Sequence, residues 1–382
     1  MREQVVSRVL RRLKVAWRES LMSIWGKNLT IDIFGESHGE AIGVVISGLA
    51  PGLRLDAGKI NAFLERRKAG DEEWSTKRRE DDEFRILSGT YKGITTGAPL
   101  CAVCENRAAR SGDYRKGLNR PGHADYTASV RYAGFNDPRG GGVFSGRLTA
   151  PLVFAGAVAS QALEQKGIYT AAHIKSIAGV EDGAFGLEVP RELAEALKSS
   201  RFPLLDASVR EDMLAKIKEA AKEGDSVGGS VECAVAGVPA GAGAEYFGSA
   251  ESALSSILFA VPAVKAVSFG AGFKMARMRG GEANDAYALK DGRICALSNN
   301  NGGILGGITN GMPIIFEVAV KPTPSVSKPQ RTVNLETMEP ETIEITGRHD
   351  PCIVPRAVPV IEAAACVAVL DLISGGVCYG IR

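Results

Sequence analysis

Residues 41–52 read AIGVVISGLAPG and residues 230–241 read SVECAVAGVPAG. In both stretches a run of β-branched and small apolar residues, typical of a strand, leads into a turn built from glycine, proline and alanine. Each stretch also precedes a segment with helical character. The two stretches are therefore a candidate internal duplication, which the sequence alone leaves open.

Strands and helices alternate on both sides of these stretches. Apolar residues at helical spacing, several times followed by a closing glycine, predict helices at 59–70, 150–167, 209–224, 249–260 and 356–373. Strand-like runs occur at 29–35, 84–106 and 313–324, the second of which predicts a hairpin followed by a strand. No Ser-, Gly- or charge-rich linker divides the chain, so we expect one α+β unit.

The composition is that of a globular chain with nearly balanced charge. Its 382 residues include 46 Lys plus Arg against 44 Asp plus Glu, a net charge of +2, which argues against non-specific nucleic-acid binding. The basic cluster at 66–79 is interleaved with acidic residues, which also opposes an RNA-binding role. No apolar run approaches the roughly 20 residues of a membrane span. We therefore expect a cytoplasmic protein whose partners include no membrane and no nucleic acid.

Glycine is unusually frequent, at 45 residues or roughly 12% of the chain against a usual ~7%. Such usage without a low-complexity tract indicates tight turns and close backbone approaches, as found around phosphates. The common phosphate-binding and hydrolase motifs are nevertheless incomplete or missing: G-x-x-x-x-G-K-[ST], G-x-G-x-x-G, H-E-x-x-H and G-x-S-x-G. The glycines therefore serve another kind of site.

The seven cysteines are scattered, and most lie in apolar contexts, as expected for reduced core residues of a cytosolic protein. Cys101 and Cys104 form a C-x-x-C pair, but no second pair or His pair follows at zinc spacing. A redox or metal role for this pair stays an alternative. We favour a buried strand over PLCAVCEN (99–106) and predict no metal site.

The first residues differ in character from the rest of the chain. Residues 3–18 place apolar residues at helical spacing among arginines, which predicts a basic amphipathic helix able to touch a membrane surface or act as a transit peptide. The alternative, which we favour, is an upstream extension with Met22 as the true start, because the periodic pattern begins at Ser23. We therefore expect 1–22 to lie outside a single domain at 23–382.

Three of the four histidines lie in Gly-, Pro- or charge-rich segments rather than on apolar faces. They are His38 beside Ser37, His123 in a turn with Arg120, and His349 between Arg348 and Asp350. The fourth, His173, has a strand-like context and is predicted to be structural. Because an imidazole with an ordinary pKa near 6.5 can donate a proton at neutral pH, the turn histidines are candidate general acids.

Loop arginines form the second part of the predicted site. Arg147 follows GGGVFSG, and Arg66 and Arg67 precede Gly70, so several guanidinium groups are available for bidentate binding of phosphate or carboxylate. The alternative for 65–83 is a solvated surface of mixed charge. Together the arginines and histidines predict an anionic, phosphate-bearing substrate handled by general-acid histidines.

Longer motifs carry a resemblance to a known family. GESHGEAIGVVISGLAPG (35–52), GGVFSGRLTAPLVFAGAVA (141–159) and RHDPCIVPRAVPVIEA (348–363) resemble the three signatures of the chorismate synthases. Shorter motifs follow the family's order between them: RRKAG (66–70), RPGHADYT (120–127), GGILGGITNG (302–311) and KPTPS (321–325). The resemblance extends from about residue 23 to the C-terminus.

The resemblance implies a large α+β fold with a helical layer between two antiparallel β-sheets, usually assembled as a homotetramer. It implies a lyase that converts 5-enolpyruvylshikimate 3-phosphate to chorismate and phosphate by anti-1,4-elimination, in the shikimate pathway of aromatic amino acid biosynthesis. The family requires reduced FMN, although no net redox change occurs. Whether the chain reduces its own FMN with NADPH or relies on an external reductase is left open.

The resemblance also implies roles for individual residues. His38 would protonate or hydrogen-bond the departing phosphate, with Ser37 beside it. His123 would lie by the reduced flavin and assist its protonation, and Asp350 would work with flavin N5 in removing the C6 proton. The substrate anions would be clamped by Arg67, Arg120, Arg147 and Arg348. The flavin would contact Ser145, Pro262, Ala263, Gly306, Lys321, Pro322, Thr323, Pro324, Ser325 and Arg348.

Two positions depart from the family pattern. Many members have Arg-Ser-Ser where this chain has Val143, Phe144 and a serine, so one cation and one hydroxyl near the flavin are missing. An arginine common shortly after RRxxG is replaced by Glu73, with Lys77 and Arg78 as candidate substitutes. We expect retained activity with an altered FMN or phosphate pocket.

These departures motivate a competing hypothesis, a non-catalytic relative that binds a flavin or an anion through an altered pocket. A binder that had lost the chemistry should also have lost its acid and base residues. His38, His123 and Asp350 all remain, which favours the enzyme.

Overall fold

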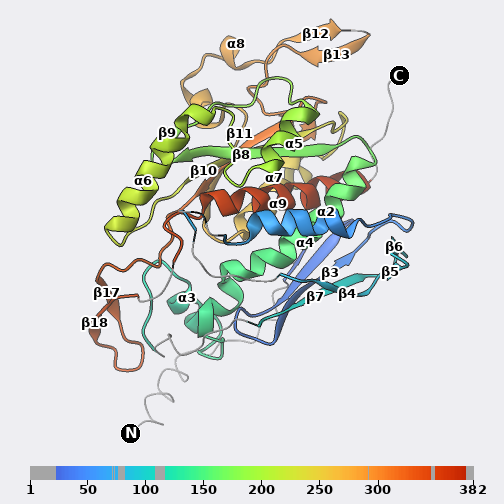
Figure 1. Cartoon of the computed structure of the whole chain (residues 1–382). Coiled ribbons are helices and arrows are strands. Elements are labelled where there is room, and N and C mark those ends of the chain that lie inside the picture. Colours follow the sequence, from blue (N-terminus) through green and yellow to red (C-terminus); the bar gives the residue numbers. More distant parts are fainter. Residues whose placement is uncertain are drawn as a thin grey trace.

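The computed structural model (Figure 1) describes residues 23–375 except 71, 73, 76–81, 108–116, 291 and 346–348. The amphipathic helix predicted at 3–18 lies outside these residues. Two five-stranded antiparallel sheets contain the main predicted strands, and helices pack against both. The chain is therefore α+β, as expected.

The first sheet has the strand order β1-β2-β3-β7-β4. Its strands are β1 (Ile24–Trp25), β2 (Thr30–Gly35), β3 (Ala41–Ser47), β4 (Arg85–Ser88) and β7 (Leu100–Glu105). Alternation along the strands turns Val44, Ile46 and Leu100 into the main core, where each is at most 1% exposed. The strands predicted at 29–35 and 41–52 are confirmed. So is the hairpin predicted before β7, which consists of β5 (Thr90–Tyr91) and β6 (Ile94–Thr95).

The second sheet has the strand order β11-β16-β10-β8-β9. Its strands are β8 (Tyr169–Ile177), β9 (Val180–Glu181), β10 (Gly229–Ala236), β11 (Val264–Phe269) and β16 (Ile314–Val320). β10 pairs with both β8 and β16, and all its residues from Ser230 onward are buried. Burial on both faces explains why SVECAVAG is a mostly apolar run rather than a strict alternation.

Four helices contribute most to the core: α2 (Ala57–Arg67), α4 (Thr149–Glu164), α7 (Ala250–Ala260) and α9 (Val354–Ser374). α4 contacts β2 and β3 of the first sheet, β8 of the second sheet, and α9. Small residues permit the close packing of α4 on α9, because a Cβ on Gly156 would lie 2.3 Å from the Cβ of Ala363. The helix predicted at 150–167 is buried along almost its whole length.

α9 is long and apolar enough to cross a membrane by length and composition, which corrects the expectation that no apolar run approaches that length. It is the one such helix among the residues that the structure describes. Arg356, Glu362 and Asp371 interrupt it, and 78% of its most apolar window is buried inside the protein. Because it packs against α4, α7 and β8, it is a core helix.

The remaining elements lie outside the two sheets. The helices are α3 (Asp125–Arg131), α5 (Arg191–Ser199), α6 (Arg210–Lys222) and α8 (Gly280–Ala283). The short 3-10 turns are η2 (Arg139–Phe144), η3 (Gly146–Leu148), η4 (Ala207–Val209), η5 (Tyr246–Gly248) and η6 (Gly272–Arg277). The hairpins are β12 (Tyr287–Lys290) with β13 (Arg293–Ala296), β14 (Ile304–Leu305) with β15 (Ile308–Thr309), and β17 (Gln330–Val333) with β18 (Pro340–Ile343). The helix predicted at 59–70 ends earlier, at Arg67, because Lys68 already has an extended conformation.

Four strands in each sheet have the same spatial order relative to their order along the chain. β2, β3, β7 and β4 are successive neighbours in the first sheet, as β8, β10, β16 and β11 are in the second, and a helix follows both β3 and β10. Their turns contain equivalent hydrogen bonds: Thr95 Oγ1 donates to Ala50 O at 2.7 Å, and Thr309 Oγ1 donates to Pro239 O at 2.7 Å. These threonines lie in two similar segments, GITTGAP (93–99) and GITNGMP (307–313), whose similarity was not predicted from the sequence.

The C-x-x-C pair lies on β7. A separation of three residues along a strand turns Cys101 and Cys104 to opposite faces, so the two thiols cannot bind one ion together. Both are free thiols, and Cys104 is 2% exposed. The buried-strand interpretation is confirmed.

Candidate active site

Ser37 and His38 lie on a tight turn between β2 and β3. Within the turn, Gly39 N donates to Glu36 O at 3.0 Å. From the end of β7, the side-chain amide of Asn106 donates to Glu36 O at 2.9 Å and to Gly39 O at 3.0 Å. The turn is therefore fixed from the neighbouring strand, and it holds a hydroxyl and an imidazole side by side.

The glycine run of η2 packs directly on this turn. Gly140 has φ +63°, and a Cβ there would lie 2.5 Å from both Ser37 Oγ and His38 Cδ2. Ser37 N donates to Gly142 O at 3.3 Å. Only glycine allows this close approach, so the run serves to bring the backbone against the predicted catalytic pair.

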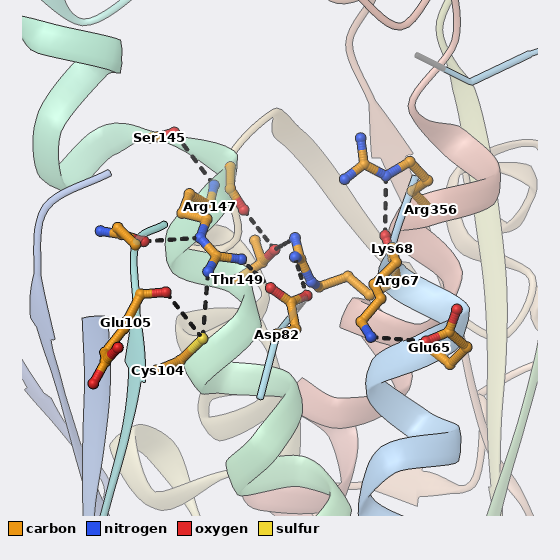
Figure 2. Close-up of polar contacts among 12 residues, drawn as sticks. Glu65, Arg67, Lys68, Asp82, Cys104, Glu105, Ser145, Arg147, Thr149 and Arg356 are labelled. Carbon is orange, nitrogen blue, oxygen red and sulfur yellow. Dashed lines mark hydrogen bonds and ion pairs between the residues drawn. The ribbon is translucent and has the colours of Figure 1, made fainter. Parts of the chain in front are cut away.

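Two arginines predicted to bind substrate share one carboxylate (Figure 2). Arg67 Nη2 lies 2.5 Å from Asp82 Oδ2, and Arg147 Nη1 forms an ion pair with Asp82 Oδ1. Arg67 ends α2, whereas Arg147 lies on η3 just before α4. Each of the three side chains is at most 8% exposed, so Arg67 and Asp82 do not belong to the solvated surface considered as the alternative for 65–83.

Asp82 is constrained by its backbone and by its neighbours. Its φ of +45° is left-handed, a conformation that Asp tolerates better than most residues. Burial favours the neutral acid, but the charges and hydrogen bonds of Arg67 and Arg147 outweigh burial and lower the pKa of the carboxyl. Asp82 is therefore an anion at neutral pH and holds both guanidinium groups.

Arg147 is also held by Cys104 on β7, by Asn106 directly after β7, and by Ser145. Its Nε donates to Asn106 Oδ1 at 3.2 Å, and its Nη2 lies 3.4 Å from Cys104 Sγ. Its backbone N–H donates to Ser145 Oγ at 3.3 Å. Burial raises the pKa of the Cys104 thiol, so this neighbour is uncharged at neutral pH. Because Asn106 also holds the Ser37 turn, one side chain joins the arginine cluster to that turn.

Asp350, which was predicted to work with flavin N5 in removing the C6 proton, lies in the loop that leads into α9 and is 8% exposed. Its Oδ2 forms an ion pair with Nη1 of Arg356, in the first turn of α9. Arg356 Nε donates to the backbone carbonyl of Arg67 at 3.0 Å (Figure 2). The guanidinium group of Arg356 therefore contacts both the Asp350 carboxylate and the backbone of Arg67, a predicted anion-binding residue.

The turn with His123 meets the predicted flavin loop. His123 Nε2 lies 2.9 Å from Ser325 Oγ, and Nδ1 lies 3.1 Å from Pro121 O. Lys321 Nζ donates to Gly122 O at 2.6 Å. Since the carbonyl can only accept, we assign the proton to Nδ1, which leaves Nε2 to accept a hydrogen bond from the Ser325 hydroxyl.

His123 differs from an ordinary histidine in its charge. Burial, together with the positive charge of Arg120, lowers the pKa of His123 to about 4. The ring is therefore neutral at pH 7 in the protein without ligands. In that state it is a hydrogen-bonding group and not the charged acid that an ordinary pKa predicts.

Arg120 is folded back on Asp125. Its Nε and Nη2 each donate to one oxygen of that carboxylate at 2.8 Å, and its backbone N–H donates at 2.9 Å. Burial favours the neutral acid, but these hydrogen bonds lower the pKa of Asp125. A Cβ on Gly141 would lie 3.8 Å from Arg120 Nη2, so Arg120 borders the glycine run of η2.

Two hydrogen bonds join the predicted flavin loop to the loop with Asp350. Ser226 Oγ donates to Thr323 O at 2.6 Å, and the next residue, Val227, donates its N–H to Pro351 O at 2.9 Å. The predicted residues of the Ser37 turn, α2, η2, η3 and these loops therefore form one connected set.

The prolines of KPTPS are packed against glycines. A Cβ on Gly228 would lie 2.9 Å from Pro322 Cδ, and a Cβ on Gly122 would lie 2.8 Å from Pro324 Cβ. Larger residues at these glycines would therefore displace the loop.

Some predicted residues lie apart from this set or outside the described residues. Ala263, after Pro262, has φ +76°, and its carbonyl accepts from Lys321 N at 2.9 Å, so this pair adjoins the loop. Gly306 lies in the β14–β15 turn before β16, whereas Lys321 follows β16, so roughly 20 Å of strand separates the two. Outside the described residues are Arg348, Glu73, Lys77 and Arg78.

The departures at Val143 and Phe144 lie at the surface of η2. They are 45% and 44% exposed, and the Phe144 ring lies 6.4 Å from that of Tyr132. The apolar pair therefore forms an edge of the site next to the glycine run.

Three residues that hold the site together were not predicted from the sequence: Asp82, Asn106 and Arg356. Asp82 was one acidic residue among many in a mixed-charge segment, and its partners are distant in sequence. Arg356 gave a usable signal, because a charge within the otherwise apolar α9 is expected to have a partner when it is buried.

A separate hollow contains none of the predicted site residues. It lies between the N-terminal strand, α7 and the end of α9, and its lining includes Trp25, Gly243, Phe247 and Leu372. The site described above is therefore defined by its polar contacts rather than by this hollow.

Known proteins resemble this chain along most of its length. The family model for chorismate synthase matches residues 29–373. A chorismate synthase of Thermococcus gammatolerans is 48% identical over 349 residues, which cover 91% of this chain and 96% of the relative. One of Dehalococcoides mccartyi is 45% identical over 349 residues, which cover 91% and 95%. A solved structure, "Crystal Structure of Chorismate Synthase", is 27% identical with a TM-score of 0.71 and covers 91% of this chain and 92% of its own.

A connected set of guanidinium, imidazole, hydroxyl and carboxylate groups, at the junction of two antiparallel sheets and their helices, defines an enzyme that acts on an anionic small molecule. The chain belongs to the chorismate synthase family. It is accordingly a lyase that eliminates phosphate from 5-enolpyruvylshikimate 3-phosphate to give chorismate, in the shikimate pathway. The non-catalytic alternative is not favoured.

Proposed function

We propose that the connected set around Ser37, His38 and Asp350 binds 5-enolpyruvylshikimate 3-phosphate beside reduced FMN and catalyses its anti-1,4-elimination. The observation that carries this proposal is the cluster of Arg67, Asp82 and Arg147. Arg356 connects this cluster to Asp350, because it contacts both the Arg67 carbonyl and the Asp350 carboxylate. Such an arrangement combines donors for a phosphate or carboxylate with a group that can accept a proton.

The substrate anions are held in this proposal by Arg67, Arg120 and Arg147, with Arg348 as a fourth cation. A guanidinium group gives two parallel hydrogen bonds to phosphate or carboxylate. In a site with little water these bonds strengthen as negative charge grows on the departing phosphate.

The elimination breaks two bonds on opposite faces of the ring. The electron pair of the C6–H bond forms a new ring double bond, and the existing double bond shifts. The C3–O bond then breaks, and its electron pair leaves with the phosphate. His38, with Ser37 beside it, donates a hydrogen bond or proton to the phosphate oxygen. Asp350 orients and receives the C6 proton. An anti geometry requires the phosphate donors and Asp350 to face opposite sides of the ring.

Reduced FMN, when bound, supplies electron density that helps phosphate leave and recovers it as the C6–H bond breaks. The residues of KPTPS fit a polar cofactor, because Thr323 Oγ1 is buried and has no hydrogen-bond partner among the described residues. Lys321 and Ser325 add a cation and a hydroxyl on the same loop, beside His123. We propose cofactor contacts from Ser145, Pro262, Ala263, Gly306, Lys321, Pro322, Thr323, Pro324, Ser325 and Arg348.

We further propose a cytoplasmic homotetramer, with NADPH as a candidate reductant of FMN. Leu289 and Ile294 are paired across the β12–β13 hairpin and are 76% and 75% exposed. A two-stranded hairpin with an exposed apolar pair is stabilised when another surface covers it. Sedimentation should give about four times the 40.3 kDa chain mass. Turnover in air with NADPH and oxidised FMN would establish the reductant.

For the architecture we propose one domain at 23–382, with the helices sandwiched between two sheets related by a pseudo-two-fold repeat. The shared strand order and the equivalent threonine hydrogen bonds of the GITTGAP and GITNGMP turns support the repeat. The contacts of α4 with strands of both sheets support the sandwich.

Two variants test the assigned roles. His38→Ala and Asp350→Ala should each abolish most turnover under anaerobic conditions with chemically reduced FMN, while flavin binding measured by fluorescence is kept. Turnover close to that of the unmodified enzyme in either variant would show that the assignment of that residue is wrong.

A further inference from the structure

The guanidinium group of Arg356 links the loop that contains Asp350, proposed to remove the C6 proton, to the end of α2, which contains the proposed anion-binding residue Arg67. Arg356 Nη1 pairs with Asp350 Oδ2, and Arg356 Nε donates to Arg67 O at 3.0 Å. Arg67 is the last residue of α2, and its side chain reaches Asp82 and Thr149. The chain of contacts therefore runs from the proposed proton acceptor to the proposed anion-binding arginines.

The position of Arg356 makes this link rigid. It is the third residue of α9, directly after Pro355, and its side chain is 21% exposed. Cys352 and Val354, on either side of the start of α9, are fully buried. The guanidinium group is planar, so contacts through Nε and Nη1 fix its orientation as well as its distance. Its positive charge also suits the carbonyl end of α2.

We propose that Arg356 is a positioning residue that sets the place of Asp350 relative to Arg67, and so the distance between proton acceptor and anion-binding site. Arg356 acts through these two residues and does not itself touch the substrate. The inference rests on the proposed function. Losing the guanidinium group should leave substrate binding largely intact, because the Arg67–Asp82–Arg147 cluster remains, but should misplace the acceptor.

The alternative is that Arg356 only stabilises the end of α2, and Arg201 provides the matched control. Arg201 Nη1 donates to Glu65 O at 2.9 Å, and its Nη2 donates to Lys68 O at 2.9 Å. Arg201 therefore binds carbonyls in the same last turn, but the structure gives it no contact with Asp350 among the described residues. If anchoring α2 were all that matters, Arg201→Gln and Arg356→Gln should have similar effects.

The experiment compares Arg356→Gln, Arg356→Lys and Arg201→Gln in steady-state turnover, with substrate carrying either hydrogen or deuterium at C6. For Arg356→Gln we expect kcat to fall on the order of 100-fold, KM to change by less than about 3-fold, and the deuterium isotope effect on kcat to increase. Arg356→Lys keeps a cation near Asp350 and should fall between this variant and the unmodified enzyme. Arg201→Gln should keep the kcat and isotope effect of the unmodified enzyme.

Each outcome decides the matter. An unchanged isotope effect in Arg356→Gln, or equal losses in Arg201→Gln, would overturn the positioning role. A smaller folded fraction lowers the amount of active enzyme but not its isotope effect, so partial unfolding does not imitate the expected result. If Arg356→Gln fails to fold, the isotope effect in Arg356→Lys decides instead. An unmodified enzyme without turnover would contradict the proposed function rather than this inference.

Discussion

Asp82 binds two arginines that are far from it and from each other in sequence. Its carboxylate is fully buried between Arg67 and Arg147. Each guanidinium group is thereby held with a fixed orientation, which a phosphate-binding site requires. Without this anion the two cations would repel each other in a medium of low dielectric constant.

Asp82→Asn should therefore weaken both folding and substrate binding. Breaking a buried ion pair by removing one partner costs about 3–5 kcal/mol. Because the folded pKa of Asp82 is lowered, its contribution is present above the unfolded pKa of about 3.9 and is lost as pH falls through the folded value. Urea unfolding at pH 7 and titration with inorganic phosphate measure the two effects.

The control for this variant is Asp225→Asn, which removes an exposed ion pair with Lys328. It should cost no more than about 1 kcal/mol. Equal stability losses in the two variants would show that Asp82 has no special role.

His123 gives a second prediction for a single side chain. NMR titration of the imidazole in the ligand-free protein should show its inflection near the pKa of about 4, because burial and Arg120 oppose the charged ring. A bound anionic flavin should move the inflection to higher pH, because negative charge favours the imidazolium. An inflection near 6.5 without ligand is the outcome that would refute the neutral assignment.

Single residues could be predicted from sequence where a short motif carries the chemistry. Ser37, His38 and Asp350 lie in such motifs. Asp82 and Arg356 were not assigned partners, because the contacts of Asp82 with Arg147, 65 residues away, and of Arg356 with Arg67, 289 residues away, depend on the fold.

At the level of the strands, β8 and β10 are joined by a buried charged cluster. His173 Nδ1 lies 2.8 Å from Asp182 Oδ2, and Nε2 lies 2.9 Å from Glu232 Oε2. Burial opposes the imidazolium, but hydrogen bonds that the ring donates to both carboxylates raise the pKa of His173 above its ordinary value. The histidine joins two strands of the second sheet and has no place in the proposed site.

His173→Gln should remove a pH-dependent part of the stability. Because the folded pKa is raised, the contribution is fully present below the unfolded pKa of about 6.5 and is lost as pH rises through the folded value. The free energy of unfolding of the unmodified protein should therefore decline above pH 6.5 more steeply than that of the variant. Ser176→Ala, which removes a neutral hydrogen bond across the same strands, should keep the steep decline. Parallel pH curves for His173→Gln and the unmodified protein would contradict this account.

The packing of α4 on α9 gives a prediction about helices. Gly156→Ala would place a Cβ 2.3 Å from that of Ala363, so the helices must separate. We expect a loss of about 1–3 kcal/mol in the free energy of unfolding. Gly281→Ala on α8, where a Cβ meets no atom within 4 Å, should be neutral or slightly stabilising. A neutral effect at Gly156 would show that the helix contact is looser than described.

Helices and strands were largely predictable because their periodicity is local. The helices at 150–167, 209–224, 249–260 and 356–373 were found within a few residues. The end of α2 was placed too late, at Gly70, because the chain leaves the helix at Lys68 without a glycine. The similarity between 41–52 and 230–241 predicted a possible duplication. The stronger similarity between the GITTGAP and GITNGMP turns was not part of that prediction.

For the whole molecule, the site draws its groups from both sheets and from the loops around α9. The Ser37 turn and α2 belong to the first sheet and its helices, whereas KPTPS follows β16 of the second. No local sequence pattern predicts that the Ser37 turn, α2 and the KPTPS loop lie next to one another. The resemblance to a family supplied the grouping of these residues, and the hydrogen bonds through Asn106, Ser226 and Arg356 give it a physical basis.

The measurement that tests the central claim most directly is a single turnover of the complete protein without oxygen. Enzyme and chemically reduced FMN are mixed with 5-enolpyruvylshikimate 3-phosphate, and chorismate absorbance and phosphate release are followed together. We predict equal amounts of both products, with none formed when FMN is oxidised and no reductant is present. Tight FMN binding with neither product would contradict the claim that this site eliminates phosphate.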